Sequence, residues 1–168
     1  NIIGRIDRQL DKGNIDIVIG GPPCQAYSLA GRSRDPNGMR GDKRNYLFRF
    51  YATFLSRYKP KYFVFENVLG ILSAGNAKYL KEILCLFARV GYQTDVKVLN
   101  AADYGVLQRR RRVFIIGRRG KKKFIFPELS KCENIWETKR HLLSDLPILM
   151  PGEEVQVAEY VKPTNTYL

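Results

Sequence analysis

The stretch Ile15–Ser28, IDIVIGGPPCQAYS, decides how this chain is interpreted. Its first part, Ile15–Ile19, is almost continuously apolar and β-branched, which predicts a strand buried on both faces. Gly20–Gly21 then permits a sharp exit and a close backbone approach, and Pro22–Pro23 stiffens the loop by fixing φ. A strand that ends in this way presents the thiol of Cys24 at its carboxyl end.

Further strands and two helices are predicted downstream. Strands are expected at Tyr62–Phe65, Val96–Leu99 and Val113–Ile116, with a short edge strand at Phe124–Phe126. Apolar residues recur at three- and four-residue steps from Leu47 to Tyr58 and from Leu80 to Val90, which predicts amphipathic helices ended by Pro60 and Gly91. Strands alternating with helices are typical of a parallel α/β sheet, whose ligands bind beyond the carboxyl ends of the strands.

Charge is the unusual feature of the composition. The 168 residues hold 29 Lys and Arg against 16 Asp and Glu, a net charge of +13, which indicates a nucleic-acid partner or simply a basic protein. Cys24, Cys85 and Cys132 are widely spaced and His141 is the single histidine, so neither a disulfide framework nor a metal site is expected. Without a signal peptide or apolar span, we expect a soluble intracellular protein. The start at Asn1 indicates a fragment, a processed chain or an incomplete one.

Several blocks together resemble the cytosine-C5 DNA methyltransferase family. GGPPCQAYS is similar to the nucleophile block of that family, ENV (Glu66–Val68) to its acid block, and YGVLQRRRRVFIIG (Tyr104–Gly117) to its arginine block. RNYLFRFYATFL (Arg44–Leu55) is similar to the intervening helix, and HLLSDLP (His141–Pro147) more loosely to the entry of the target-recognition region. The order and spacing of these blocks carry the resemblance, which implies an incomplete Rossmann-like, S-adenosylmethionine-dependent methyltransferase fold.

The resemblance assigns a role to each residue of the proposed centre. Cys24 is the nucleophile that adds to C6 of cytosine; the alternative is a buried structural cysteine. Glu66, expected at a buried strand end, is the acid at N3; the alternative is a capping or ion-paired glutamate. Asn67 orients that carboxyl, bonds neighbouring backbone or contacts DNA. Alternation along the strand would turn Arg110 and Arg112 to the active site, to hold O2 or pair with Glu66, unless the run is only solvated surface.

Cofactor and DNA contacts are implied by the same resemblance. Pro23 and Leu47 are the only residues carried over for S-adenosylmethionine, and Leu47 serves core packing equally well. No FxGxG-like block is present, so we expect the isolated chain to bind this cofactor poorly. The loop Gly31–Arg44 is rich in glycine and basic residues and would close over a flipped cytosine. The DNA contacts implied there and at its root are Gln25, Ser28, Arg32 and Arg40.

The sequence therefore predicts a DNA (cytosine-5)-methyltransferase of the restriction-modification type. Residues 1–120 would form the catalytic part and 121–168 a tail leading to target recognition. Duplex DNA is the expected partner, together with the remainder of the enzyme as another segment or chain, and neither metal nor membrane is expected. A prokaryotic enzyme would lie in the cytoplasm with the nucleoid, and a eukaryotic one in the nucleus. The alternatives are a tRNA-methylating member of the family and a non-catalytic DNA-binding fragment.

Overall fold

A computed structural model describes most of the chain up to residue 132 and short pieces beyond it. The described residues are 2–10, 13–23, 27, 43–106, 108–122, 126–128, 130–132, 146, 149–155 and 157. Contacts divide the chain into two units, Asn1–Leu99 with Arg111–Glu128 and Asn100–Arg110 with Leu129–Leu168. The predicted division at residue 120 stays a prediction, and each unit is described on its own.

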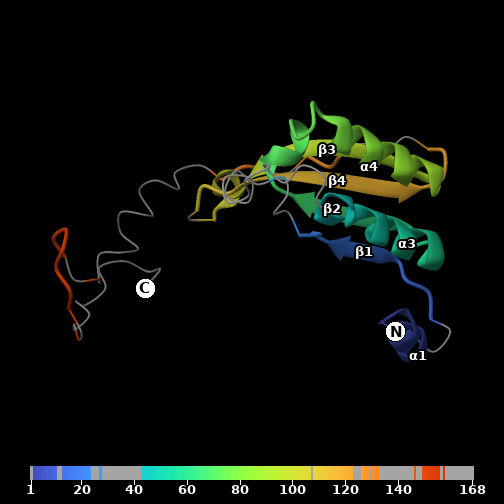
Figure 1. The fold of residues 1–168 in the computed structure, drawn as a ribbon, viewed down its shortest axis with the longest axis horizontal. Coiled ribbons are helices and arrows are strands. Elements are labelled where there is room, and N and C mark those ends of the chain that lie inside the picture. The colour runs from blue at the N-terminus through green and yellow to red at the C-terminus, as the bar shows by residue number, and fades with distance from the viewer. Residues whose placement is uncertain are drawn as a thin grey trace. The chain divides into compact units, whose positions relative to one another are not determined.

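A four-stranded sheet forms the centre of the first unit, in the order β1-β2-β4-β3 (Figure 1). β1 (Ile17–Gly20) pairs in parallel with β2 (Tyr62–Asn67), whereas β4 (Arg111–Arg119) runs antiparallel to β2 and β3 spans Tyr92–Asn100. The α/β class is confirmed, but the sheet is mixed rather than parallel. The connection from β3 to β4 is short, and without a crossover helix the chain can only reverse direction.

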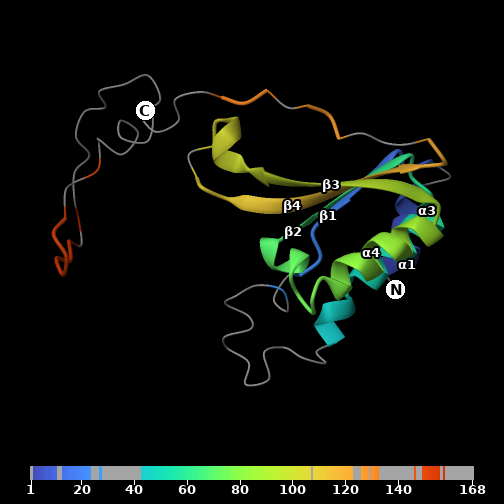
Figure 2. The ribbon, with the colours of Figure 1, turned by 90° about the horizontal axis from the view of Figure 1, so that it is seen from above.

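Both predicted helices are confirmed, and they lie on one face of the sheet (Figure 2). α3 spans Phe48–Tyr58 and ends where Lys59 takes a left-handed φ of 46° before a proline. α4 spans Lys78–Arg89 and is followed by Gly91 at φ 96°. These left-handed residues turn the chain out of each helix and back into the next strand.

The core lies between these helices and one face of β2 and β4. Phe63 and Phe65 of β2 alternate with less buried neighbours, and both are at most 1% exposed. Tyr51 of α3 packs edge-on against both rings, 5.9 and 5.2 Å between centroids. Phe63 faces Gly117 across the ladder, and a Cβ at Gly117 would stand 1.9 Å from the Phe63 ring. Glycine is therefore required where this ring crosses β4.

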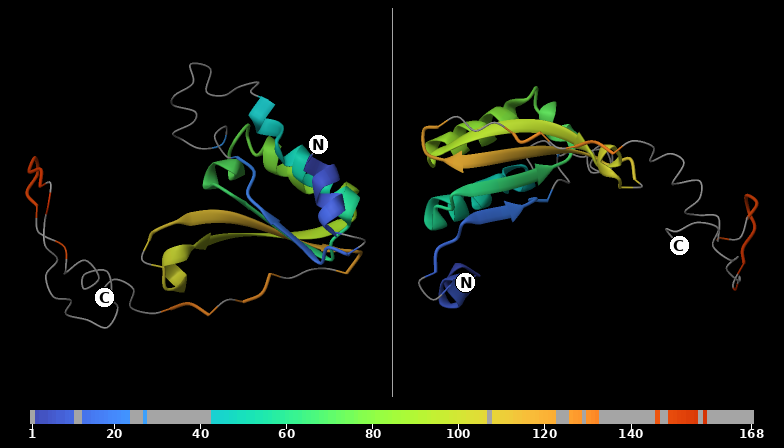
Figure 3. Two further views of the ribbon diagram at one scale, coloured as in Figure 1. Left: turned by 90° about the horizontal axis from the view of Figure 1, so that it is seen from below. Right: turned by 180° about the vertical axis from the view of Figure 1, so that it is seen from behind.

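The opposite face of the sheet is much less covered, and here one expectation is wrong. Ile15–Ile19 was expected to be buried on both faces, yet Ile17 is 47% and Ile19 is 72% exposed. β1 is the last strand in the sheet order, as Figures 1 and 3 show, and α3 and α4 cover only the other face. The apolar β-branched run therefore predicted the strand correctly but not the exposure of its side chains on the open face.

Some short elements carry no prediction from the sequence. The helix α1 (Ile2–Leu10) was missed, although Ile3, Ile6 and Leu10 recur at helical spacing. Asp7 of α1 forms an ion pair with Arg57 of α3. Within the described ranges, 3₁₀ turns are found at Lys43–Tyr46, Leu69–Leu72 and Ala101–Tyr104.

The tail contributes little to the described sheet. Phe126 is buried but is not part of a strand, and the other two residues of the predicted edge strand lie outside the described residues. In the second unit, Cys132 N–H donates to the Asp103 carbonyl at 2.8 Å. Among the described residues no helix has the length and apolar character needed to cross a membrane.

Candidate active site

The carboxyl ends of β1 and β2 bring the chain that leads to Cys24 against Glu66. In the parallel ladder Gly20 pairs with Phe65, so Gly21 comes level with Glu66. A Cβ built on Gly21 would lie 2.6 Å from Oε2 of Glu66 and 3.2 Å from its carbonyl oxygen. Real Cβ atoms do not approach so closely, so glycine is needed for backbone to touch the carboxylate.

Asn67, the last residue of β2, forms a side-chain hydrogen bond to the same loop. Its side chain is 2% exposed, and its Oδ1 accepts a hydrogen bond from Val68 N–H at 3.0 Å. That bond fixes the orientation of the amide, and Nδ2 donates a long hydrogen bond to the Pro22 carbonyl at 3.4 Å. Pro22 and Pro23 have no backbone N–H to donate, so this part of the loop can form hydrogen bonds only through its carbonyl oxygens. The Asn67 side chain supplies the donor for one of them. The predicted contact of Asn67 with DNA stays a prediction, and among the described contacts both polar side-chain atoms are engaged within the protein.

Glu66 and Arg112 are brought together on the open face of the sheet. Across the antiparallel ladder Glu66 pairs with Phe114, and Arg112 lies two residues along the same face. Arg112 Nε stands 2.8 Å from Glu66 Oε1, and the two side chains are 24% and 33% exposed respectively. Glu66 was expected to be buried, and this is wrong because α3 and α4 cover the other face. Arg112 Nη1 also donates to the Arg111 carbonyl at 2.9 Å.

Arg110 is not part of this arrangement as described. β4 begins at Arg111, so the alternation that was expected to turn Arg110 and Arg112 to one face does not extend to Arg110. Arg110 lies in the second unit, where its side chain is exposed and its carbonyl accepts a hydrogen bond from Ala101 N–H at 2.9 Å. The catalytic role of Arg110 therefore stays a prediction.

Most of the other predicted residues lie outside the described part of the chain. These are Cys24, Gln25, Ser28, Arg32 and Arg40. Pro23 is described and exposed, and Leu47 is half-buried immediately before α3. Within the described residues no cluster of three His, Cys, Asp or Glu side chains could hold a metal.

Tyr27 anchors the far side of the Cys24 segment and was missed by sequence reasoning. Its side chain is 3% exposed, and its ring packs 5.4 Å from that of Tyr79. Burial raises the pKa of Tyr27, so the phenol stays neutral at ordinary pH. Pro22 is thus bonded by Asn67, and Tyr27 is buried beside an aromatic ring. An aromatic residue within a Gly- and Pro-rich loop was the available signal.

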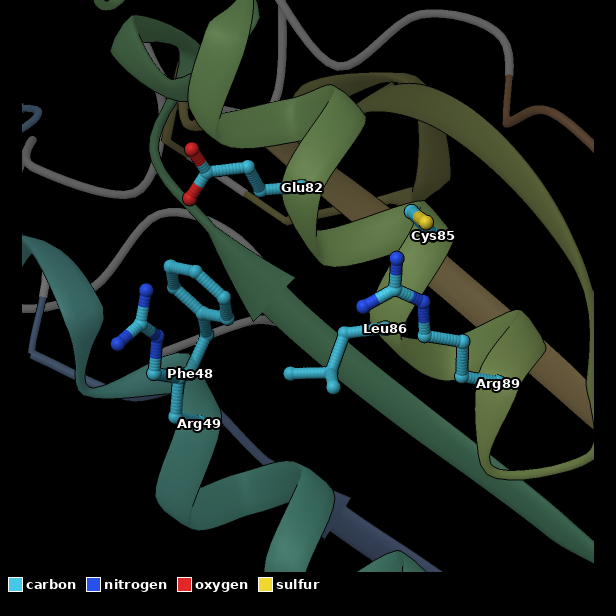
Figure 4. Close-up of a pocket in the computed structure, with 6 residues that line it drawn as sticks. All are labelled: Phe48, Arg49, Glu82, Cys85, Leu86 and Arg89. Atoms are coloured by element: carbon cyan, nitrogen blue, oxygen red, sulfur yellow. The ribbon is translucent and has the colours of Figure 1, made fainter.

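A separate groove runs between α3 and α4 (Figure 4). It has a volume of about 350 Å³ and is lined by Phe48, Arg49, Glu82, Cys85, Leu86 and Arg89. None of the predicted catalytic residues lines this groove, so we do not expect in it the reaction that is expected at the strand ends.

The family model of C-5 cytosine-specific DNA methylases matches residues 3–164. The chain is 43% identical to type II methyltransferase M.Bpa9945I of Bacillus paralicheniformis, covering 88% of this chain and 36% of that protein. It is 40% identical to type II methyltransferase M.DdeI of Desulfomicrobium norvegicum, covering 96% and 40%. The chain thus spans well under half the length of these relatives.

Solved structures agree with the fold. A prophage-encoded E. coli protein described as a DNA modification methyltransferase is 30% identical, with a TM-score of 0.52 over 68% of this chain and 30% of its own. The Entamoeba histolytica methyltransferase EhMeth, 22% identical, superimposes with a TM-score of 0.51 over 75% and 38%. The second similarity concerns the fold alone.

Proposed function

This chain belongs to the C-5 cytosine-specific DNA methylase family, and from that premise we propose that the protein methylates C5 of cytosine in duplex DNA as a type II modification enzyme. The observation that carries the proposal is the convergence at the ends of β1 and β2. Gly21 touches Glu66, Asn67 bonds the Pro22 carbonyl, and Arg112 pairs with Glu66. Glu66 and Asn67 therefore meet the root of the Cys24 loop, and Arg112 joins them through its ion pair with Glu66.

The proposed reaction begins with the thiolate of Cys24. Cytosine C5 is too weak a nucleophile to attack a methyl donor until a sulfur adds to C6 and makes C5 enamine-like. C5 would then attack the methyl carbon of S-adenosylmethionine, and the S–CH3 bond would break to leave a neutral thioether. A base would remove the C5 proton, and the electrons of that C–H bond would expel the thiolate. The hydrogen bond at Pro22 and the burial of Tyr27, on either side of Cys24 in the sequence, support this role.

Glu66 and Arg112 would stabilise the charge that addition at C6 drives into the pyrimidine ring. The open face leaves a third of the Glu66 side chain exposed, so the edge of a base can reach the carboxyl. Closing a base there would exclude the remaining solvent and bring the Glu66 carboxyl within hydrogen-bond reach of N3. Arg112 uses Nε and Nη1 in its two contacts, and Nη2 is left to donate to O2 of the base.

S-adenosylmethionine would supply the methyl group as a sulfonium, and two described residues fit part of its site. Pro23 is exposed beside the proposed nucleophile, and Leu47 offers a half-buried apolar surface before α3. Neither side chain carries a polar atom, so these residues would provide apolar contacts to the cofactor. Any polar contacts to its ribose and amino-acid groups would come from other residues.

A cytosine in duplex DNA must leave the base stack to reach such a site. We propose that the basic stretch Gly31–Arg44, including Arg32 and Arg40, closes over the flipped base, with Gln25 and Ser28 at its root. Its five basic residues suit contact with phosphates. Proteolysis of this stretch should slow when DNA and cofactor product are added together, and equal rates would contradict closure.

The experiment that tests the function is a covalent trap with the full-length protein. Duplex DNA containing 5-fluorocytosine should form a denaturant-resistant complex when S-adenosylmethionine is present, because fluorine cannot leave C5 as the proton does. Cys24→Ser should form none. Methyl transfer from labelled cofactor to duplex DNA and to tRNA distinguishes the two substrates. If the wild-type protein formed no trapped complex, the result would favour the alternative, a non-catalytic DNA-binding protein.

A further inference from the structure

Tyr79, in the first turn of α4, contacts two tyrosines that lie far from it in the chain. Its ring centroid is 5.4 Å from that of Tyr27 and 5.9 Å from that of Tyr46. In Figure 2 the 3₁₀ turn that ends at Tyr46 lies beside the start of α4. Burial raises the pKa of Tyr79, as do the neighbouring Tyr46 and a hydrogen bond between the two side chains. One side chain of α4 therefore joins two segments that are well separated in the sequence.

These two segments carry different parts of the proposed reaction. Tyr27 lies three residues after Cys24, the proposed nucleophile. Tyr46 immediately precedes Leu47, a proposed contact to S-adenosylmethionine. Methyl transfer requires the base and the methyl carbon to be aligned, so a small displacement of either segment slows the reaction. Tyr79 contacts both segments and can therefore set their relative position.

The turn before α4 holds the Tyr79 ring from behind. Gly75, Asn76 and Ala77 have successive φ values of 57°, 54° and 63°, and this left-handed conformation is strained for alanine. A Cβ built on Gly75 would lie 3.1 Å from Cε2 of Tyr79, which is closer than most real Cβ contacts. Glycine therefore lets the turn pass close to the ring. Strained backbone of this kind persists where the surrounding structure requires it, and here it limits the movement of the ring.

A second aromatic residue of α4 serves the main core instead. Phe87 is fully buried, and its ring contacts those of three core residues, Tyr51, Phe63 and Phe65. Tyr79 is only half-buried and contacts the segments next to the candidate site. One helix thus carries a ring for the core and a ring for these segments, and the two can be changed separately.

We propose that Tyr79 is a positioning residue that fixes the segment after Cys24 relative to Leu47, and so aligns the nucleophile with the methyl donor. Tyr79 acts through Tyr27 and Tyr46. The catalytic part of this role rests on the proposed function, whereas the holding of Tyr27 can be measured without activity. Each aromatic pair changes an equilibrium constant by about two- to twelvefold, so losing both contacts should free the two segments measurably.

Amide hydrogen exchange of the full-length protein, under native conditions, tests whether Tyr79 holds its partner. In Tyr79→Leu, exchange in peptides that contain Tyr27 should be about tenfold faster, because leucine lacks both ring pairs. Tyr79→Phe keeps the ring and should exchange within about threefold of the wild type. Phe87→Leu is the matched control, since it also removes a ring from α4. It should lower the urea midpoint without speeding exchange at Tyr27.

Steady-state methyl transfer to unmethylated genomic DNA tests the catalytic consequence. In Tyr79→Leu, kcat should fall by about 10- to 100-fold and KM for S-adenosylmethionine should rise, with the Kd for DNA unchanged. A merely structural role would lower the amount of active protein and leave KM unchanged. Tyr79→Phe should restore both parameters, and Phe87→Leu should keep the wild-type KM. Tyr27→Leu/Tyr79→Leu should be no worse than the more impaired single variant, because either change breaks the same contact.

Two results would overturn the inference. One is equal exchange at Tyr27 in the wild type and in Tyr79→Leu, because Tyr79 would then hold nothing there. The other is an equal change of KM in Tyr79→Leu and Phe87→Leu, which would mean that general destabilisation is responsible. Failure of the proposed function appears differently, as a wild-type protein that transfers no methyl group to DNA. Exchange at Tyr27 would still decide whether Tyr79 holds the segment.

Discussion

The side-chain amide of Asn67 donates a hydrogen bond to the carbonyl oxygen of Pro22, although the two residues are 45 positions apart in the chain. The strand that supplies the proposed acid thereby holds the loop that presents the proposed nucleophile. Glu66 and Asn67 act on the same loop from adjacent positions, one through contact with Gly21 and the other through this bond.

Asn67→Asp should slow covalent trapping without weakening DNA binding. Aspartate keeps the acceptor for Val68 N–H but turns an oxygen toward the Pro22 carbonyl, which repels it. We expect about a tenfold lower trapping rate, the equivalent of 1 to 2 kcal/mol for one lost charge-free hydrogen bond. The rate is measured by quenched-flow trapping and the affinity by fluorescence anisotropy.

Asn67→Ser is the second variant for this bond, because its hydroxyl bonds Val68 but is too short to reach Pro22. It should show the same loss of rate. A higher Kd for DNA with an unchanged trapping rate would instead indicate that Asn67 touches DNA.

Gly21→Ala should separate the carboxylate from its arginine. The added Cβ would stand 2.6 Å from Glu66 Oε2, so the side chain must move. Trapping should fall by about 10²-fold, the range expected when an acid is displaced. Gly4→Ala provides the control, since nothing lies within 4 Å of its Cβ. Normal trapping by Gly21→Ala would show that the contact with Glu66 has no catalytic consequence.

Arg112→Lys should impair trapping and leave stability almost unchanged. The ion pair with Glu66 is a quarter to a third exposed, so its loss should cost about 1 kcal/mol or less. Lysine lacks the fork that engages Glu66 and a base together, and trapping should fall by about 10²-fold. Urea unfolding and trapping are measured on the same preparation. A large drop in the urea midpoint would mean that Arg112 serves mainly the fold.

Gly117→Ala should destabilise the first unit. Its Cβ would overlap the Phe63 ring at 1.9 Å in a fully buried part of the core. Overpacking of this kind costs about 1–3 kcal/mol, measured by urea unfolding. The double variant Gly117→Ala/Phe63→Leu should be less destabilised than the sum of the two single changes. If the two single changes in unfolding free energy simply added, the strain caused by Gly117→Ala would not come from its contact with Phe63.

Tyr51→Phe should lower the free energy of unfolding and weaken the dependence of that free energy on pH. The Tyr51 hydroxyl lies 3.0 Å from the Val18 carbonyl oxygen and 2.9 Å from that of Val64, so it bridges β1 and β2. Its loss should cost about 1 kcal/mol. Burial raises the pKa of Tyr51, so the folded state retains the phenol proton longer than the unfolded chain does. Its contribution is therefore complete below pH of about 10 and is lost above it, by up to about 1.4 kcal/mol per pH unit.

The measurement is the free energy of unfolding from pH 8 to pH 11, and the slope should be shallower in Tyr51→Phe. Tyr62→Phe, which removes a more exposed phenol, is the control. Parallel slopes in all three proteins would show that Tyr51 does not carry the dependence.

Local patterns in the chain predicted α3, α4 and four strands and suggested the candidate residues, but they missed α1. Three- and four-residue spacing predicted α3 and α4, because one apolar stripe must face a core. Apolar runs predicted the four strands, and the blocks around Cys24, Glu66 and Arg112 indicated the family. These properties depend on residues that are neighbours in sequence, so they can be read without coordinates.

Direction, burial and pairing required the folded sheet. The reversal of β4, the exposure of Ile19 and Glu66 and the buried bond of Asn67 all depend on the register between strands far apart in the chain. Periodicity states which residues share a face of one strand but not which strand lies beside it or what covers that face. The contact between Gly21 and Glu66 is the clearest example, because a glycine has no side chain from which a partner could be inferred.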